Sequence, residues 1–197
     1  MSCHPLAKFL LDILNPIANN TDSYIKNTPH FIEKISKINI TPNSLMVSFD
    51  VVSLFTNVPV DKSLKIVRDR LEQDTHLIDR TKLNIDSILE LLTLCVKTTY
   101  FQLNNEFFQQ DFGMAMGSPI SPLLSNIFME DFENNTINSF SKKPVIWLRY
   151  VDDIFAIWQH NVSEIDIFLE YINSREPTIK FTLEVERGNR LCHFLMF

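Results

Sequence analysis

The residues best suited to chemistry are two adjacent carboxylates, Asp152 and Asp153, between two short apolar runs. Both runs, 146–149 and 154–158, are rich in β-branched and aromatic residues, which predicts two strands joined by a tight hairpin turn. Like charges this close resist joint ionisation, and a divalent cation removes that cost. Metal ions held in pairs by aspartates, about 4 Å apart, recur in enzymes of phosphoryl and nucleotidyl transfer. The alternative is an ordinary surface turn, because Asp is a good turn former.

A third carboxylate, Asp50, lies near the end of another predicted strand, 45–52. Apolar residues occupy every second position of this strand, which predicts one buried face, and Asp50 points away from it. Asp is depleted in strands, so its presence there is unusual. The alternative is that Asp50 caps the turn or helix that follows. The alternating apolar positions are Leu45, Val47, Phe49 and Val51.

The other predicted elements must position these carboxylates. Helices are predicted over 61–74, 85–98 and 118–139 and from Ser163 onward, a hairpin over 100–108, and a final strand over 179–186. The hairpin turns on an Asn-Asn pair, and Asp166 forms a weak capping box with Ser163. Without the inserted helix and hairpin at 84–112, the order is β-α-β-β-α-β, the split βαβ arrangement of α+β, ferredoxin-like folds.

This topology predicts where the carboxylates meet. A right-handed crossover makes the first two strands parallel, with the third strand antiparallel between them. The carboxyl end of the first strand then lies beside the turn that joins the second and third. Asp50 is therefore expected next to Asp152 and Asp153, and three carboxylates at one sheet edge predict a metal site.

Three motifs resemble the palm domain of reverse transcriptases, and the wording is closest to the Penelope-like retroelements, whose polymerases are related to telomerase. The matching text is Ser-Phe-Asp-Val-Val-Ser-Leu-Phe-Thr-Asn-Val-Pro at 48–59, Gly-Met-Ala-Met-Gly-Ser-Pro-Ile-Ser-Pro at 113–122 and Arg-Tyr-Val-Asp-Asp at 149–153, with weaker matches at 179–182 and 191–197. One such motif is unspecific by itself, whereas three in sequence are highly specific.

The resemblance implies an RNA-directed DNA polymerase that adds nucleotides from deoxynucleoside triphosphates to a DNA primer on an RNA template, using two Mg²⁺ ions, with Mn²⁺ as the alternative. Asp50 and Asp152 would be the principal metal ligands, supported by the Val51 carbonyl and by Asp153. One metal ion would lower the pKa of the primer 3′-hydroxyl, and the other would hold the triphosphate and the leaving pyrophosphate.

The resemblance also implies nucleotide-binding residues. Phe55 matches the aromatic that packs under the sugar and rejects a 2′-hydroxyl, which favours DNA synthesis. Gly113 and Gly117 would let the backbone approach the nascent base pair, and Ser118 and Pro119 belong to the same segment. The alternatives are a core aromatic for Phe55 and a plain loop before a helix for the glycines.

The match has two departures. In related families the last motif reads Leu-Pro-Phe-Leu-Asp, whereas 191–196 read Leu-Cys-His-Phe-Leu-Met, without the Pro and the Asp. Lys180 could match the lysine that protonates pyrophosphate, but the solvent face of an edge strand is the preferred interpretation.

We expect residues 1–44 to be a partial helical fingers lead-in and 45–197 to be the palm. Basic fingers residues and a thumb are expected outside this segment, so the chain alone is expected to extend a primer poorly. Its unpaired fingers surface is expected to expose Leu10, Leu14 and Phe31, and so to favour self-association.

Composition bounds the class of protein. A chain of 197 residues with 45% hydrophobic content can bury one core. No apolar run approaches the ~18 residues of a membrane span. Cys3, Cys95 and Cys192 are typical of reduced thiols, which predicts an intracellular protein of nucleus or cytoplasm that is not secreted. The net charge of −6 argues against strong nucleic-acid binding. It favours the alternative of a non-catalytic, truncated or domesticated remnant that binds nucleic acid or protein.

Overall fold

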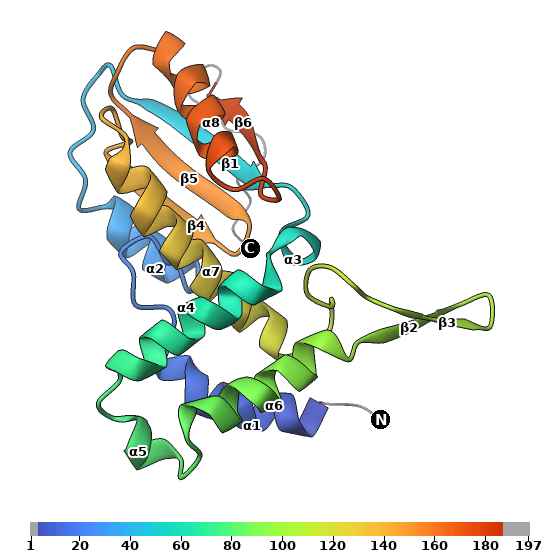
Figure 1. Ribbon diagram of the computed structural model, residues 1–197. Helices are drawn as coiled ribbons and strands as arrows, with labels where there is room; N and C mark the ends of the chain where they lie inside the picture. Colours follow the sequence, from blue (N-terminus) through green and yellow to red (C-terminus); the bar gives the residue numbers. More distant parts are fainter. Residues whose placement is uncertain (1–3, 187–197) are drawn as a thin grey trace. The chain divides into compact units, whose positions relative to one another are not determined.

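A computed structural model describes residues 4–186 (Figure 1). They form two compact units that interleave along the chain. Unit 1 holds residues 4–20 and 53–131, and unit 2 holds residues 21–52 and 132–186. The helix α7 (Ile120–Thr136) runs from unit 1 into unit 2. The predicted domain boundary between residues 44 and 45 stays a prediction.

Unit 2 is built on a four-stranded sheet with the order β4-β5-β1-β6. Its strands are β1 (Leu45–Val51), β4 (Ile146–Tyr150), β5 (Asp153–Trp158) and β6 (Phe181–Val185). Every neighbouring pair is antiparallel, so β1 and β4 run parallel to each other on either side of β5. This order confirms the predicted split βαβ arrangement and the α+β class.

Helices cover both faces of this sheet. On one face, Phe31 and Ile35 of α2 (Thr28–Ile35) pack against Phe155 and its buried neighbours. On the other face, Phe168 of α8 (Ser163–Arg175) packs against Phe49, with ring centroids 5.8 Å apart. The strand over 45–52 was predicted to bury one face only, which is wrong for Ser48 (4% exposed), because the second face of the sheet is covered too.

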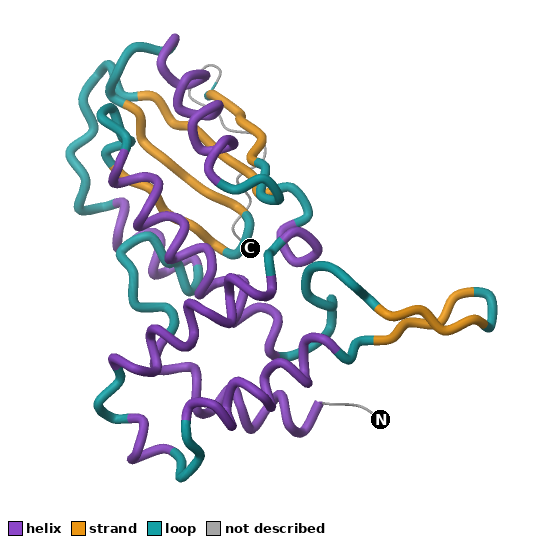
Figure 2. Tube along the Cα trace, in the orientation of Figure 1, coloured by secondary structure: helices purple, strands orange, loops and turns teal. Residues whose placement is uncertain are grey.

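Unit 1 is helical, with one hairpin. Its helices are α1 (His4–Leu14), η1 (Asn15–Ile17), α3 (Leu54–Asn57), α4 (Val60–Gln73), α5 (Leu77–Arg80), α6 (Ile85–Lys97) and the first part of α7. The strands β2 (Tyr100–Leu103) and β3 (Glu106–Gln109) form an extended arm (Figure 2). Asn104 and Asn105 both have positive φ, 51° and 65°, as a type I′ turn requires, so the hairpin turns where predicted.

Helix ends follow local hydrogen bonding. Asn84 caps α6 by accepting a hydrogen bond from the Ser87 N–H at 2.8 Å. The helix predicted over 118–139 ends as α7 at Thr136 and continues as a 3₁₀ turn, η2 (Ile137–Ser139). The predicted capping box of Ser163 and Asp166 is wrong. The N-cap residue of α8 is Val162, whose side chain makes no capping hydrogen bond. Instead, the Asn161 side chain accepts from the Ser163 N–H at 3.2 Å.

The surface predicted for self-association is wrong in its residues. Leu10 and Leu14 are fully buried in unit 1, and Phe31 packs against the core of the unit 2 sheet. Exposed apolar side chains lie instead on and after the β2–β3 hairpin, where Phe107 is 75% exposed. Among residues 4–186, no helix has the length and apolar character needed to cross a bilayer. The predicted final motif at 191–197 lies outside the described residues.

Candidate active site

Asp50 and Asp153 lie directly opposite each other where β1 pairs with β5. Residues opposite each other in an antiparallel pair carry their side chains on the same face of the sheet. The next residue, Val51, donates its backbone N–H to the carbonyl of Asp152 at 3.1 Å. Asp50 is exposed, whereas Val51 beside it is 1% exposed. The topology therefore brings these positions together where β1 ends and β5 begins, as predicted from the order of elements.

The turn that carries Asp152 is strained. Val151 and Asp152 form a two-residue loop between the paired residues Tyr150 and Asp153. Val151 has φ +59°, the conformation of the first loop residue in a turn of the II′ kind, where glycine is usual. A β-branched residue there is an outlier, at a cost of about 1–3 kcal/mol. Such strain persists only where the surroundings hold it, and it gathers at functional sites.

The carboxylates suit a cation that arrives with its own ligands. Within residues 4–186, no three His, Cys, Asp or Glu side chains are grouped to hold a metal ion. Mg²⁺ commonly takes one or two carboxylates from the protein and completes its octahedron with water and substrate phosphates. Asp50, Asp152 and the Val51 carbonyl would be such a partial set. Their assignment as metal ligands stays a prediction.

A buried ion pair beside the turn was not foreseen from the sequence. Arg149 is 1% exposed, and its Nε donates to Glu133 Oε1 at 2.6 Å. Its Nη1 donates to the carbonyl of Val151 at 3.2 Å. The available signal was a cation in the apolar strand 146–150 together with an acid on the preceding helix.

The predicted nucleotide-binding segments meet within unit 1. The Phe55 carbonyl on α3 accepts a hydrogen bond from the Met114 N–H at 2.7 Å. Gly113 has φ +70°, and a Cβ on it would lie 2.2 Å from the carbonyl oxygen of Thr56. Gly113 is therefore required by the packing of its loop on α3. Its approach to a base pair stays a prediction.

Gly117 differs from Gly113. It has φ +93°, but a Cβ on it would meet nothing within 4 Å. The segment 115–119, which includes Ser118 and Pro119, lines a cavity of about 420 Å³ together with Tyr100 and Phe107. Of the two glycines, only Gly117 therefore has open space at the position of a Cβ. Its approach to a base pair stays a prediction.

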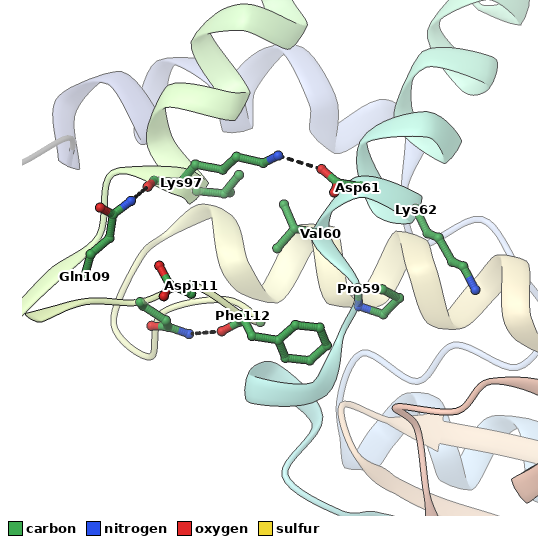
Figure 3. A pocket seen from close by; sticks show the side chains of 11 residues that line it. Pro59, Val60, Asp61, Lys62, Lys97, Gln109, Asp111 and Phe112 are labelled. Atoms are coloured by element: carbon green, nitrogen blue, oxygen red, sulfur yellow. Dashed lines mark hydrogen bonds and ion pairs between the residues drawn. The ribbon is translucent and has the colours of Figure 1, made fainter.

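A second cavity of unit 1, of about 480 Å³, lies between the first turn of α4, the end of α6 and the segment that follows β3 (Figure 3). Its polar groups bind one another. Lys97 Nζ lies 2.7 Å from Asp61 Oδ1, and Gln109 donates to the Lys97 carbonyl at 3.0 Å. These bonds brace the hairpin on α4 and α6, and we assign no ligand to this cavity.

Lys180 is exposed and donates to the Asn173 carbonyl at 2.7 Å. It precedes β6, the edge strand of the sheet, in agreement with the preferred interpretation.

Comparison with solved structures shows the fold of polymerases. Telomerase of Candida albicans, solved with a fragment of telomeric RNA, matches with a TM-score of 0.71 and 14% identity, over 95% of this chain and 35% of that chain. Apo telomerase of Candida tropicalis matches with a TM-score of 0.70 and 12% identity, over 95% and 37%. The BmCPV RNA-dependent RNA polymerase at elongation state matches with a TM-score of 0.62 and 12% identity, over 92% and 18%. The chain thus spans about a third of the telomerase chains.

The search of curated proteins found no match. The family model described as "Reverse transcriptase (RNA-dependent DNA polymerase)" matches residues 1–186. With this match over nearly all of its length, the chain belongs to the reverse transcriptase family.

Proposed function

We propose that this chain is the palm and part of the fingers of a retroelement reverse transcriptase of the Penelope-like type. It would transfer deoxynucleotides to a primer 3′-hydroxyl on an RNA template. The observation that carries the proposal is the register of Asp50 with Asp153 beside a strained turn that presents Asp152. Family membership and the motif text at 48–59, 113–122 and 149–153 support it.

Asp50, Asp152 and the Val51 carbonyl would hold two Mg²⁺ ions, or Mn²⁺, and Asp153 would support them. When bound, the metal ions activate the primer hydroxyl and neutralise charge on the triphosphate. The chain contributes a fixed geometry, because the Val51 N–H is bonded to the Asp152 carbonyl and so ties β1 to the turn. Holding reacting groups in place supplies a large part of the catalysis of phosphoryl transfer.

Phe55 would select the sugar. The hydrogen bond from the Met114 N–H to the Phe55 carbonyl fixes the backbone of this residue. A ring held in one place rejects a 2′-hydroxyl by steric clash, and the rejection is lost when the ring is removed. In a chain completed with the fingers and thumb of a full-length relative, we expect Phe55→Val to narrow the preference for dGTP over rGTP, measured as kcat/KM. An unchanged ratio of kcat/KM for dGTP and rGTP would indicate that Phe55 only packs in the core.

The direct test of the function is primer extension on poly(rA)/oligo(dT) at low salt, with Mg²⁺ or Mn²⁺. We expect weak extension that disappears in Asp152→Asn and remains in Asp86→Asn. Asp86 is a suitable control because it is a surface carboxylate of α6, paired with Arg68 at 2.8 Å. Equal extension by all three proteins would contradict the proposed site.

A non-catalytic binding module is the second candidate, and the net charge of −6 favours it. An acidic surface gains little from counterion release on a nucleic acid. Absence of any metal-dependent extension by the wild type, with retained binding of poly(rA), would favour this candidate.

Two further properties belong to the proposal. Reduced cysteines support an intracellular location, and Cys95 is buried. Self-association would use the exposed apolar residues of the hairpin, such as Leu103 and Phe107, in place of α1. Sedimentation of the wild type and of Phe107→Ser tests whether the hairpin mediates self-association. Association that is unchanged by the substitution would exclude the hairpin.

A further inference from the structure

We infer that Arg149, held by Glu133, is a positioning residue that fixes the strained turn presenting Asp152 and Asp153. This inference rests on the proposed function of these carboxylates. Arg149 acts through the carbonyl of Val151, which belongs to the peptide immediately before Asp152.

The Arg149 side chain is held in place by Glu133. Its Nε and Nη2 donate to the two oxygens of Glu133, at 2.6 and 3.4 Å. Glu133 is itself fixed, because it accepts from Trp147 Nε1 at 3.0 Å and from Ser23 Oγ at 2.7 Å. A buried acid with four donors around it does not rearrange cheaply.

The backbone of Arg149 is fixed as well. Its N–H donates to the Ser23 carbonyl at 2.7 Å, and its carbonyl accepts from the Ile25 N–H at 2.9 Å. On the other side, Arg149 pairs with Ile154 of β5. Arg149 is therefore held at its backbone by the neighbouring segments and at its guanidinium by Glu133.

The same guanidinium also contacts the turn. Its remaining nitrogen, Nη1, donates to the Val151 carbonyl at 3.2 Å. Val151 has φ +59°, which a β-branched residue leaves unless something holds it. A rotation of the Val151 peptide would redirect the backbone that carries Asp152. The hydrogen bond from Arg149 opposes that rotation.

The geometry requires a guanidinium in particular. One planar group contacts both oxygens of Glu133 and a carbonyl on its other side, which the fixed fork of arginine allows. A lysine ammonium keeps the charge that Glu133 needs, but it is a single point and cannot span both partners. Arg149→Lys therefore separates the role in charge balance from the role in the turn.

The chain contains a matched control. Arg70 Nη1 lies 2.6 Å from Glu130 Oε2, and Glu130 is 0% exposed. Arg70 also donates to the carbonyls of Ile17 and Ile127 in unit 1. Arg70→Lys weakens a pair whose acid, Glu130, lies on the same helix as Glu133. It changes no contact with the turn.

The experiment compares wild type, Arg149→Lys and Arg70→Lys by two readouts on the whole chain. Amide hydrogen exchange at 151–153 reports the turn without any metal. Mn²⁺ affinity, from the relaxation rate of water protons, reports the carboxylates. We expect Arg149→Lys to speed exchange in the turn and to weaken Mn²⁺ binding about 10- to 100-fold, as loss of supporting groups around metal ligands does. Arg70→Lys should leave both readouts unchanged.

The two readouts also separate this inference from the proposed function. Exchange and Mn²⁺ affinity that match wild type in Arg149→Lys would overturn the inference, and so would equal effects from Arg70→Lys. If the wild type binds no Mn²⁺, the proposed function fails. The exchange rates in the turn then still decide whether Arg149 holds it.

Discussion

Two glutamates of α7, Glu130 and Glu133, each form a buried pair with an arginine, but in different units of the molecule. Glu130 pairs with Arg70 in unit 1, where the arginine also binds the backbone of η1 and of α7. Glu133 pairs with Arg149 in unit 2, where the arginine also binds the strained turn. The first pair therefore joins helices, and the second extends to the candidate active site.

A buried ion pair alone says little about function. Both pairs have an N···O distance of 2.6 Å and a buried carboxylate. Replacing such a pair by apolar residues is often neutral, so stability alone is a weak reason for its presence. The backbone carbonyls that each arginine also binds distinguish the two pairs. The substitutions that follow change one partner at a time.

The largest effect is expected from Glu133→Leu. Removing one partner of a buried pair costs about 3–5 kcal/mol, because the other charge stays buried and unpaired. Here the substitution also leaves Trp147 Nε1 and Ser23 Oγ without their acceptor. Guanidinium denaturation followed by tryptophan fluorescence measures this loss. Both tryptophans of the chain, Trp147 and Trp158, are buried in unit 2 and report on that unit.

Glu130→Leu is the matched variant in unit 1. We expect a smaller loss, about 1–3 kcal/mol, because Arg70 is 22% exposed and keeps the carbonyls of Ile17 and Ile127. Far-UV circular dichroism follows the helices of this unit. A larger loss from Glu130→Leu than from Glu133→Leu would reverse the comparison.

The two units also treat strained backbone differently. Unit 1 places Gly113 at φ +70° against Thr56, so Gly113→Ala adds both strain and a clash. We expect it to cost about 3 kcal/mol, and Gly117→Ala, in open space, about 1 kcal/mol. Denaturation midpoints of both variants check the order, and equal losses would show that the contact with Thr56 does not matter.

Unit 2 places Val151 at a positive φ, where glycine would fit without strain. We expect Val151→Gly to raise stability by up to about 1 kcal/mol, since relief of strain is partly offset by the freer unfolded chain. The same change should weaken Mn²⁺ binding if the strained turn positions Asp152. A destabilised variant with unchanged Mn²⁺ affinity would separate the turn from the site.

The smallest effect concerns acid. In unit 1, the hydrogen bond from Arg80 holds the pKa of Asp74 below its ordinary 3.8. In unit 2, the hydrogen bond from Lys142 likewise lowers the pKa of Glu164. A carboxylate with a lowered folded pKa adds stability above its unfolded pKa and loses it as the pH falls through the folded value. In Asp74→Asn, the free energy of unfolding should therefore fall less than in the wild type as the pH drops below about 4. The difference is at most about 1 kcal/mol. Denaturation at pH 3 and pH 6 measures it.

The sequence was sufficient for the sheet because its pattern is local and its topology is constrained. Alternation and β-branched runs located all four strands, and the right-handed crossover rule placed Asp50 beside the turn that carries Asp153. The partners of Arg149 could not be predicted, because Glu133 and Ser23 are distant in sequence and no periodicity relates them. The burial of Ser48 and Leu10 depended on which helices cover them, which is a property of the folded chain.

We propose that Asp50 and Asp152 hold a divalent cation where β1 ends beside the turn before β5. The most direct test of this claim is a Mn²⁺ titration of the folded chain followed by the relaxation of water protons, with Asp50→Asn, Asp152→Asn and the control Asp86→Asn. We predict that the wild type and the control bind Mn²⁺ alike and that each of the other two substitutions removes this binding. Equal Mn²⁺ binding by all four proteins, or none by the wild type, would contradict the claim.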